Sequence, residues 1–408
     1  MMPASVRDEF ERRLTRFINE KLLGGGQAVG VDTLLFEEGY INSLRVLDLL
    51  AFVEKTLGRK IPDHTVRLAN FRSVRAITRT FLEGRAEHDS ERLFEHRTGR
   101  TRFTSPVDAL RTRGDVTLLG PGRVALGGAV LALHRFFDAA ALRWARELGA
   151  VEHEFPSLIP LETLVRAGYV ASFPHLLTLA AHLEPSLDLL RRIAERPGSL
   201  ARENLTVPSH ALAPAVCYQC YPLWEGRRLD GAGPVVLTAR GRCYRHEAGE
   251  APPLERLWDF TMREIVVLGT RAEVEAAREA LVRFACELVT SLGLDGHVET
   301  ASDPFFTRAA EGRRALQKAG ALKYELRLTL DSDGRTLAAA SFNHHRDHFG
   351  RRFNITLPNG AAAHTGCVAL GLERWVLAFF AQHGLDERRW PEDVRAWRDT
   401  GIVSAQSA

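Results

Sequence analysis

The segment that decides the fold of this chain is residues 242–267, which read RCYRHEAGEAPPLERLWDFTMREIVV. Two strand-like, mainly apolar runs flank a turn region rich in Gly, Pro and Glu, and this order predicts a long antiparallel hairpin. The polar side chains of Arg245, Glu247, Arg256 and Glu264 are spaced so that several can share one face of the sheet. A face with two guanidiniums, two carboxylates and an aromatic ring suits a nucleotide better than a core, because guanidiniums match phosphate geometry.

The order of these residues resembles motif 2 of class II aminoacyl-tRNA synthetases, and the seryl branch is the most similar. The resemblance implies that Arg245 holds the α-phosphate of ATP and that Glu247 reads the adenine amino group. Arg256 would contact the phosphates, Phe260 would stack on the adenine, and Leu257 belongs to the same ATP-binding set. The alternative is a surface hairpin whose charged residues only form cross-strand ion pairs.

Two further segments extend the resemblance. Residues 366–375, GCVALGLERW, are similar to motif 3, which implies that Arg374 binds the γ-phosphate of ATP. Residues 142–160 fit motif 1, the helix and strand through which class II synthetases form homodimers. The implied fold class is α+β, with an antiparallel sheet flanked by helices over residues 115–408 and a homodimeric assembly.

Residues 1–84 have apolar residues at helical spacing and predict a small, separate four-helix bundle. This part resembles an acyl or peptidyl carrier protein, which implies that 4'-phosphopantetheine is attached to Ser43. The family has Asp in place of Asn42, so recognition by the modifying transferase is open. The alternative is a plain helical bundle in which Asn42 and Ser43 serve as helix caps. Residues 85–114 are hydrophilic and are expected to form a linker.

The sequence from Cys217 to Cys220 is half of a structural zinc site, and no second Cys-x-x-Cys completes it. Atypical seryl-tRNA synthetases and the related amino acid:[carrier protein] ligases hold zinc with Cys, Glu and Cys. By motif position, the resemblance makes these ligands Cys217, Glu264 and Cys367. The open fourth position of the zinc would take the amino group of the substrate, so Glu264 also counts as an amino-acid-binding residue.

Other metal assignments are less favoured. Cys217 is preferred over Cys220 only because of the residues before it, and the face on which Cys243 lies relative to Glu264 is open. Cys286 fits the core side of a helix. The histidine-rich segment 343–348 favours a polar or substrate-facing role over a metal site. Magnesium would accompany ATP, but residues 336–341 have no carboxylate where the family has a Glu, and whether Glu325 replaces it is open.

The composition is that of an ordinary soluble enzyme, with 26% charged and 45% hydrophobic residues. A net charge of +3 gives no basic field that would favour tRNA, and the coiled-coil arm of seryl-tRNA synthetases is missing. No apolar run has the length of a membrane span, so we expect a cytoplasmic protein without membrane contacts. Five cysteines in a long chain argue against a disulfide framework.

Together these features predict a ligase that activates a small amino acid, glycine or alanine, as an aminoacyl adenylate. The acceptor would be the phosphopantetheine thiol of a carrier protein, in the first place its own N-terminal domain. Two alternatives remain open: a seryl-type enzyme that aminoacylates tRNA, and a non-catalytic synthetase paralogue.

Overall fold

The computed structural model describes residues 4–23, 28–35, 40, 46–59, 61, 68–83, 92–99, 106–247, 252–301 and 321–400. Ser43 and Asn42, on which the carrier-protein prediction depends, lie outside the described residues. The chain divides into two compact units, Met1–Phe94 with Val298–Glu325 and Glu95–His297 with Leu326–Ala408. In the part that the structure describes, no helix is both long and apolar enough to span a membrane.

The described N-terminal segments are helical and share one core. Phe10, Leu14 and Ile18 recur at the predicted spacing, and all three side chains are buried in that core. Ser73 caps the last helix by accepting a hydrogen bond from the backbone of Ala76. The helical segments are α1 (Ala4–Phe17) with its π-helical continuation η1 (Ile18–Leu22), α2 (Val46–Leu57), α3 (Leu68–Phe71), and α4 (Val74–Ile77) with the π-helical continuation η4 (Thr78–Leu82).

A mixed, mainly antiparallel sheet of eight strands organises the rest of the chain, in the order β1-β10-β11-β12-β13-β9-β8-β4. The predicted hairpin is confirmed, because β8 and β9 pair antiparallel with Arg242 opposite Thr261. The edge strand β4 pairs parallel with β8. The strands are β1 (Phe94–His96), β4 (Val151–His153), β8 (Val235–Tyr244), β9 (Asp259–Gly269), β10 (Gly296–Thr300), β11 (Lys323–Thr329), β12 (Thr336–Arg346) and β13 (His364–Gly371).

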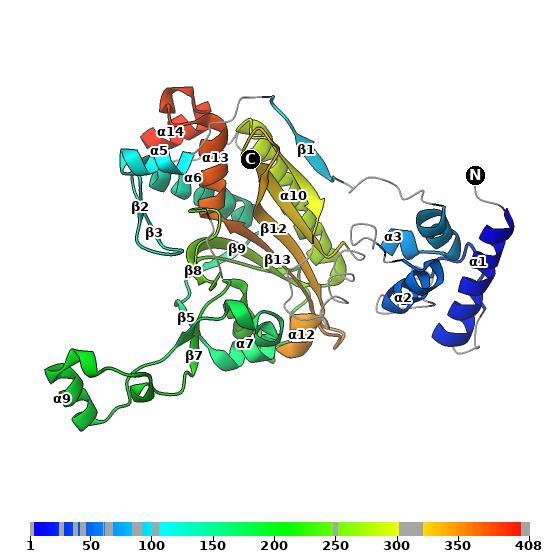
Figure 1. Ribbon diagram of the computed structural model, residues 1–408, viewed down its shortest axis with the longest axis horizontal. Helices are drawn as coiled ribbons and strands as arrows, with labels where there is room; N and C mark the ends of the chain where they lie inside the picture. Colours follow the sequence, from blue (N-terminus) through cyan, green and yellow to red (C-terminus); the bar gives the residue numbers. More distant parts are fainter. Residues whose placement is uncertain are drawn as a thin grey trace. The chain divides into compact units, whose positions relative to one another are not determined.

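One face of this sheet is covered by the long helices α6 (Gly128–Glu147), α10 (Arg271–Ser291) and α13 (Leu372–His383) (Figure 1). The side chain of Arg263 on β9 points to this face, where its guanidinium binds Asp138 of α6. Large rings fill the layer between α6 and α13, and the rings of Phe137 and Trp375 lie 5.1 Å apart. Because strand side chains alternate, Glu264 points to the opposite face.

Smaller elements surround the sheet. The segment that carries α9 stands away from the sheet at the end of an arm next to β7 (Figure 1). These elements are α5 (Pro106–Arg113), β2 (Val116–Leu118), β3 (Val124–Leu126), β5 (Leu158–Pro160), α7 (Leu161–Ala167), α8 (Tyr169–Ser172), β6 (Leu179–Ala180), α9 (Leu187–Glu195), β7 (His210–Leu212), α12 (His348–Arg352) and α14 (Glu392–Thr400).

Part of the predicted linker is regular structure. Strand β1 is the edge strand of the large sheet, and the side chain of Leu110 in α5 is fully buried. Helix α5 contacts α13 of the sheet unit. The prediction of a linker over residues 85–114 is therefore wrong for these two segments. Their composition is mainly hydrophilic, and Leu110 is the one side chain of the two segments that is fully buried, so composition alone did not reveal them.

Gly350 of α12 offers a stability prediction. A Cβ atom at this position would lie within 3.0 Å of backbone atoms of Ala363, so α12 and the residue before β13 can approach only because the side chain is absent. We expect Gly350→Ala to lower the free energy of unfolding by about 1–3 kcal/mol. Urea titration followed by tryptophan fluorescence measures this, because all 6 tryptophans lie in the sheet unit. Gly198→Ala is the control, since its Cβ would meet no atom within 4 Å.

Candidate metal and nucleotide site

The register of the central strands brings Glu264 and Cys367 together. Cys367 on β13 lies opposite Val266, and Ala369 lies opposite Glu264. Residues directly opposite each other in an antiparallel pair share a face, and so do residues two apart along a strand. The side chains of Glu264 and Cys367 therefore project from the same face, the one that α6, α10 and α13 leave uncovered.

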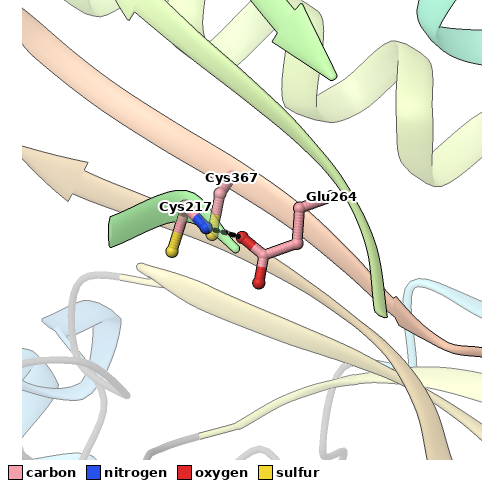
Figure 2. Close-up of side chains that lie close together, drawn as sticks. All are labelled: Cys217, Glu264 and Cys367. Atoms are coloured by element: carbon pink, nitrogen blue, oxygen red, sulfur yellow. Dashed lines mark hydrogen bonds between the residues drawn. The ribbon is translucent and has the colours of Figure 1, made fainter. Parts of the chain in front are cut away.

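Cys217 reaches this face from a separate segment, the 3-10 turn η8 (Cys217–Gln219). The backbone N–H groups of Val216 and Cys217 donate to the carboxylate of Glu264, at 3.2 and 2.8 Å. These bonds tie the turn to β9. Figure 2 shows the three side chains lying close together, with the bond between the Cys217 nitrogen and Glu264. Their ligand atoms all lie within 4.8 Å of one another, and all three residues are buried.

The pKa values of the three buried residues are shifted in different directions. Burial and the nearby sulfur of Cys367 raise the pKa of Glu264 to about 8, although the hydrogen bonds from Cys217 oppose this. The thiol of Cys217 donates to the sulfur of Cys367, which lowers the pKa of Cys367 well below its ordinary value and raises that of Cys217. His345 and Asn343 also contact the Cys367 sulfur, at 3.6 and 3.5 Å, and favour its thiolate.

Two sulfurs and one carboxylate fit a zinc ion. Zinc accepts these ligands in tetrahedral geometry, and a catalytic zinc has three protein ligands and one open position. Among the described residues, this is the one group of three candidate ligands close enough to share an ion. The neighbouring thiol of Cys220 is buried but is not a member of the group. Cys243 shares the face of Glu264, since it lies opposite Phe260, yet it too is outside the group.

Histidines do not form the cluster, but one of them adjoins it. His344 lies on the opposite face of β12 and contacts His364 at 3.2 Å between ring nitrogens. His345 instead lies between Tyr221 and Cys367, with the Tyr221 hydroxyl 3.4 Å from its Nδ1. Sequence reasoning assigned no role beside the metal to His345 or Asn343. The alternation of Ser341, Asn343 and His345 along β12 was the signal in the sequence that these side chains share one face.

The expected nucleotide residues lie around the end of the hairpin. The guanidinium of Arg245 donates from Nε to the carbonyl of Pro214 at 2.9 Å and lies 5.5 Å from the centre of the Phe260 ring. Arg256 is largely exposed and lies 3.4 Å from the carboxylate of Glu247. The side chain of Leu257 is buried. The structure thus brings Arg245 and Phe260 together, and separately Glu247 and Arg256.

Arg374 lies in the first turn of α13. Its Nε donates to the backbone carbonyl of Glu255 in the hairpin loop at 2.9 Å, and its Nη1 donates to that of Ala338 on β12 at 3.0 Å. Its neighbour Glu373 accepts hydrogen bonds from the backbone of Thr261 on β9. The hairpin and the first turn of α13 are therefore bonded to each other directly. Glu325, the open candidate for magnesium, lies on β11 and pairs with Lys323 at 3.0 Å.

Comparisons with known proteins identify the family of this chain. A family model described as the class II core domain of tRNA synthetases (G, H, P, S and T) matches residues 203–383. Amino acid--[acyl-carrier-protein] ligase 1 of Bradyrhizobium diazoefficiens is 36% identical over 259 residues, which cover 63% of this chain and 79% of that protein. The type-2 serine--tRNA ligase of Methanothermobacter thermautotrophicus is 31% identical over 293 residues, covering 67% of this chain and 56% of that protein.

Among solved structures, seryl-tRNA synthetase from M. kandleri, in complex with A. aeolicus tRNASec, superimposes with a TM-score of 0.68 at 27% identity. The match covers 81% of this chain and 69% of that one. These relatives are ligases of amino acids, which supports amino-acid activation as the general activity. The chain belongs to the class II synthetase-type family that includes the amino acid--[acyl-carrier-protein] ligases.

Proposed function

We propose that this chain activates glycine or alanine with ATP and transfers the aminoacyl group to the phosphopantetheine thiol of a carrier protein. The observation that carries the proposal is the buried Cys217–Glu264–Cys367 cluster on the face that also presents Arg245. A zinc ion held by these three residues would supply a Lewis-acid position for the amino group of the substrate. The relatives named as amino acid--[acyl-carrier-protein] ligases support the carrier protein as acceptor.

In the first step, a carboxylate oxygen of the amino acid attacks the α-phosphorus of ATP, and the bond to the β-phosphate oxygen breaks to release pyrophosphate. Arg245, Arg256 and Arg374 would hold the phosphates, with Mg²⁺ accompanying ATP. In the second step, the phosphopantetheine thiolate attacks the carbonyl carbon, AMP leaves, and a thioester forms. The residues act by orientation and charge stabilisation, because no covalent bond to the protein is needed.

The choice of a small substrate rests on the resemblance and on the surroundings of the cluster. His345, which contacts the Cys367 sulfur, is packed against Phe349 with ring centres 4.9 Å apart. Tyr221 stacks on the same Phe349 at 4.1 Å. Large rings thus adjoin the metal position and favour an amino acid with little or no side chain.

The N-terminal helical unit is the first candidate for the carrier. Its described helices share a core of their own, which is consistent with a small independent domain. Phosphopantetheine on Ser43 would present the thiol, and attachment in the same chain would raise its local concentration.

Assembly as a homodimer through residues 142–160 is also proposed, supported by the exposed apolar side chains of Val151 and Leu158. A cytoplasmic site of action completes the proposal.

Amino-acid-dependent ATP–pyrophosphate exchange tests the first step. We expect exchange with glycine or alanine in the zinc-loaded protein, and none without an amino acid. If the protein shows no exchange with any amino acid, the proposal is overturned and a non-catalytic paralogue is favoured.

The relatives that are serine--tRNA ligases support a second candidate. Exchange with serine, followed by charging of total tRNA at the same rate as exchange, would establish that activity instead.

Zinc binding is expected to become tighter as pH rises. Zinc displaces the protons of Glu264 and Cys217, about two at neutral pH. Because the pKa of Glu264 is raised to about 8, the affinity should increase between about pH 6 and pH 8. Competition with a chromophoric chelator at several pH values measures the affinity, and a pH-independent affinity would contradict this account of the site.

The raised pKa of Glu264 has the opposite effect on the metal-free protein, whose stability should fall as pH rises. The folded state retains the Glu264 proton above the ordinary pKa of 4.5, up to about 8. Its contribution to stability is therefore present at low pH and is lost as pH rises across this window. Urea titrations of metal-free protein across the window measure the loss.

A further inference from the structure

The hairpin loop is joined to two arginines at a single residue, Glu255. Nη1 of Arg335 lies 2.7 and 2.9 Å from the two carboxylate oxygens of Glu255. The backbone carbonyl of the same residue accepts the 2.9 Å hydrogen bond from Nε of Arg374. The side chain of Glu255 is only 15% exposed, so the ion pair is shielded on the glutamate side. Arg335 therefore acts on the residue to which Arg374 is bonded.

The loop at this point has a conformation that needs support. Leu254 has a φ of 67°, in the left-handed region that non-glycine residues adopt only at an energetic cost. Its side chain is buried, so it cannot relax toward solvent without losing packing. Such a conformation persists only where neighbouring contacts hold it. The next residue, Glu255, is held by its backbone hydrogen bond to the Pro252 carbonyl at 3.2 Å and, from outside the loop, by Arg335 and Arg374.

Arg335 is itself well fixed. It lies in the turn between β11 and β12, where its backbone N–H and its Nε both donate to the carboxylate of Asp331, at 2.9 Å each. Its carbonyl accepts from the backbone of Leu330. Ala338, three residues later on β12, provides the second carbonyl that binds Arg374, at 3.0 Å. Arg374 is thus held directly by Ala338 of β12 and indirectly, through Glu255, by Arg335 of the β11–β12 turn.

We propose that Arg335 is a positioning residue for the γ-phosphate end of the ATP site, acting through Glu255 on Arg374. This inference rests on the proposed function, in which Arg374 binds the γ-phosphate. Loss of the Arg335 side chain frees the Glu255 carboxylate and allows the loop to leave its left-handed conformation at Leu254. The Glu255 carbonyl then no longer fixes the guanidinium of Arg374. Arg245 and Phe260, which would hold the α-phosphate and the adenine, contact Pro214 and each other and not Glu255, so binding of the nucleoside and the α-phosphate should be unaffected.

Equilibrium binding of two nucleotides tests the proposal. In zinc-loaded Arg335→Gln, we expect the Kd for β,γ-imido-ATP to rise about tenfold and the Kd for AMP to change less than about twofold. AMP lacks the γ-phosphate, so general damage to the fold would weaken both ligands alike. An unchanged Kd for the ATP analogue, or an equal loss for both nucleotides, would overturn the proposal. Arg335→Lys should restore part of the affinity, because it keeps one charged contact to Glu255.

The matched control is Arg388→Gln. Arg388 is also exposed and pairs with a single carboxylate, that of Asp386, at 3.0 and 3.3 Å. This variant should bind both nucleotides as the parent does. Glu255→Gln completes a double-mutant cycle: the two changes together should weaken the ATP analogue no more than either alone, whereas additive effects would contradict a shared path.

These outcomes separate the inference from the proposed function. Binding is measured without an amino acid or an acceptor, so a parent protein that binds the ATP analogue and shows no pyrophosphate exchange refutes the proposed function alone. A parent that exchanges normally, together with Arg335→Gln that binds the analogue equally well, refutes the role of Arg335 alone.

Discussion

Replacing Cys367 with alanine is expected to abolish stoichiometric zinc binding and to lower amino-acid-dependent ATP–pyrophosphate exchange by at least about 100-fold. Cys367 is the member of the cluster whose pKa is lowered, so it is the ligand that gives up its proton to a metal most readily. Its loss leaves Cys217 and Glu264, two ligands that retain their protons more strongly. Metal analysis of the purified protein and the exchange assay measure the two effects.

Cys220→Ala is the matched control for this experiment. Cys220 is as buried as Cys367 and lies three residues from Cys217, yet it is not part of the three-ligand group. The variant should retain one zinc per chain and the parent exchange rate. If Cys220→Ala removed the metal and Cys367→Ala did not, the assignment of the ligands would be wrong.

The second large effect is expected at Arg245. Arg245→Ala should reduce the rate of exchange by about 1000-fold, with a smaller effect on the KM for the amino acid. The guanidinium lies beside Phe260 on the face that carries Glu264, where it would stabilise the charge that develops on the α-phosphate. Steady-state exchange kinetics, with zinc content verified, separate this loss from a loss of the metal.

Arg240→Ala provides the comparison within the same hairpin. Arg240 is also on β8, but it points to the opposite face of the sheet and pairs with Asp138 of α6 at 3.4 Å. Its replacement should leave the exchange rate within about twofold of the parent. Equal losses in the two variants would show that the exchange assay reports hairpin stability and not phosphate binding.

The sequence allowed the hairpin to be predicted because its turn and its two apolar runs are local signals. The grouping of Cys217, Glu264 and Cys367 required the resemblance, since the three residues come from segments far apart in the chain. No periodicity in the sequence could show that Cys367 lies opposite Val266, because register between strands is a tertiary property.

The features that sequence reasoning missed depend on the same kind of long-range contact. The backbone N–H groups of Val216 and Cys217 that bind Glu264 have no signature in residue type. The contact of His345 with Cys367 depends on the pairing of β12 with β13. Strand β1 and helix α5 were taken for a linker because they contain few apolar residues, although these few are enough to join a sheet edge and to pack against α13.

The central claim is that an amino acid is loaded onto a thiol arm, and intact-mass measurement tests it most directly. The chain is co-expressed with a phosphopantetheinyl transferase, and its mass is compared with that of Ser43→Ala. ATP, Mg²⁺, zinc and glycine or alanine are then added. We predict one phosphopantetheine group that Ser43→Ala lacks, and then one aminoacyl group that hydroxylamine removes, as expected for a thioester. A chain that is unmodified at Ser43, or one that carries the arm and remains unacylated, would contradict the account.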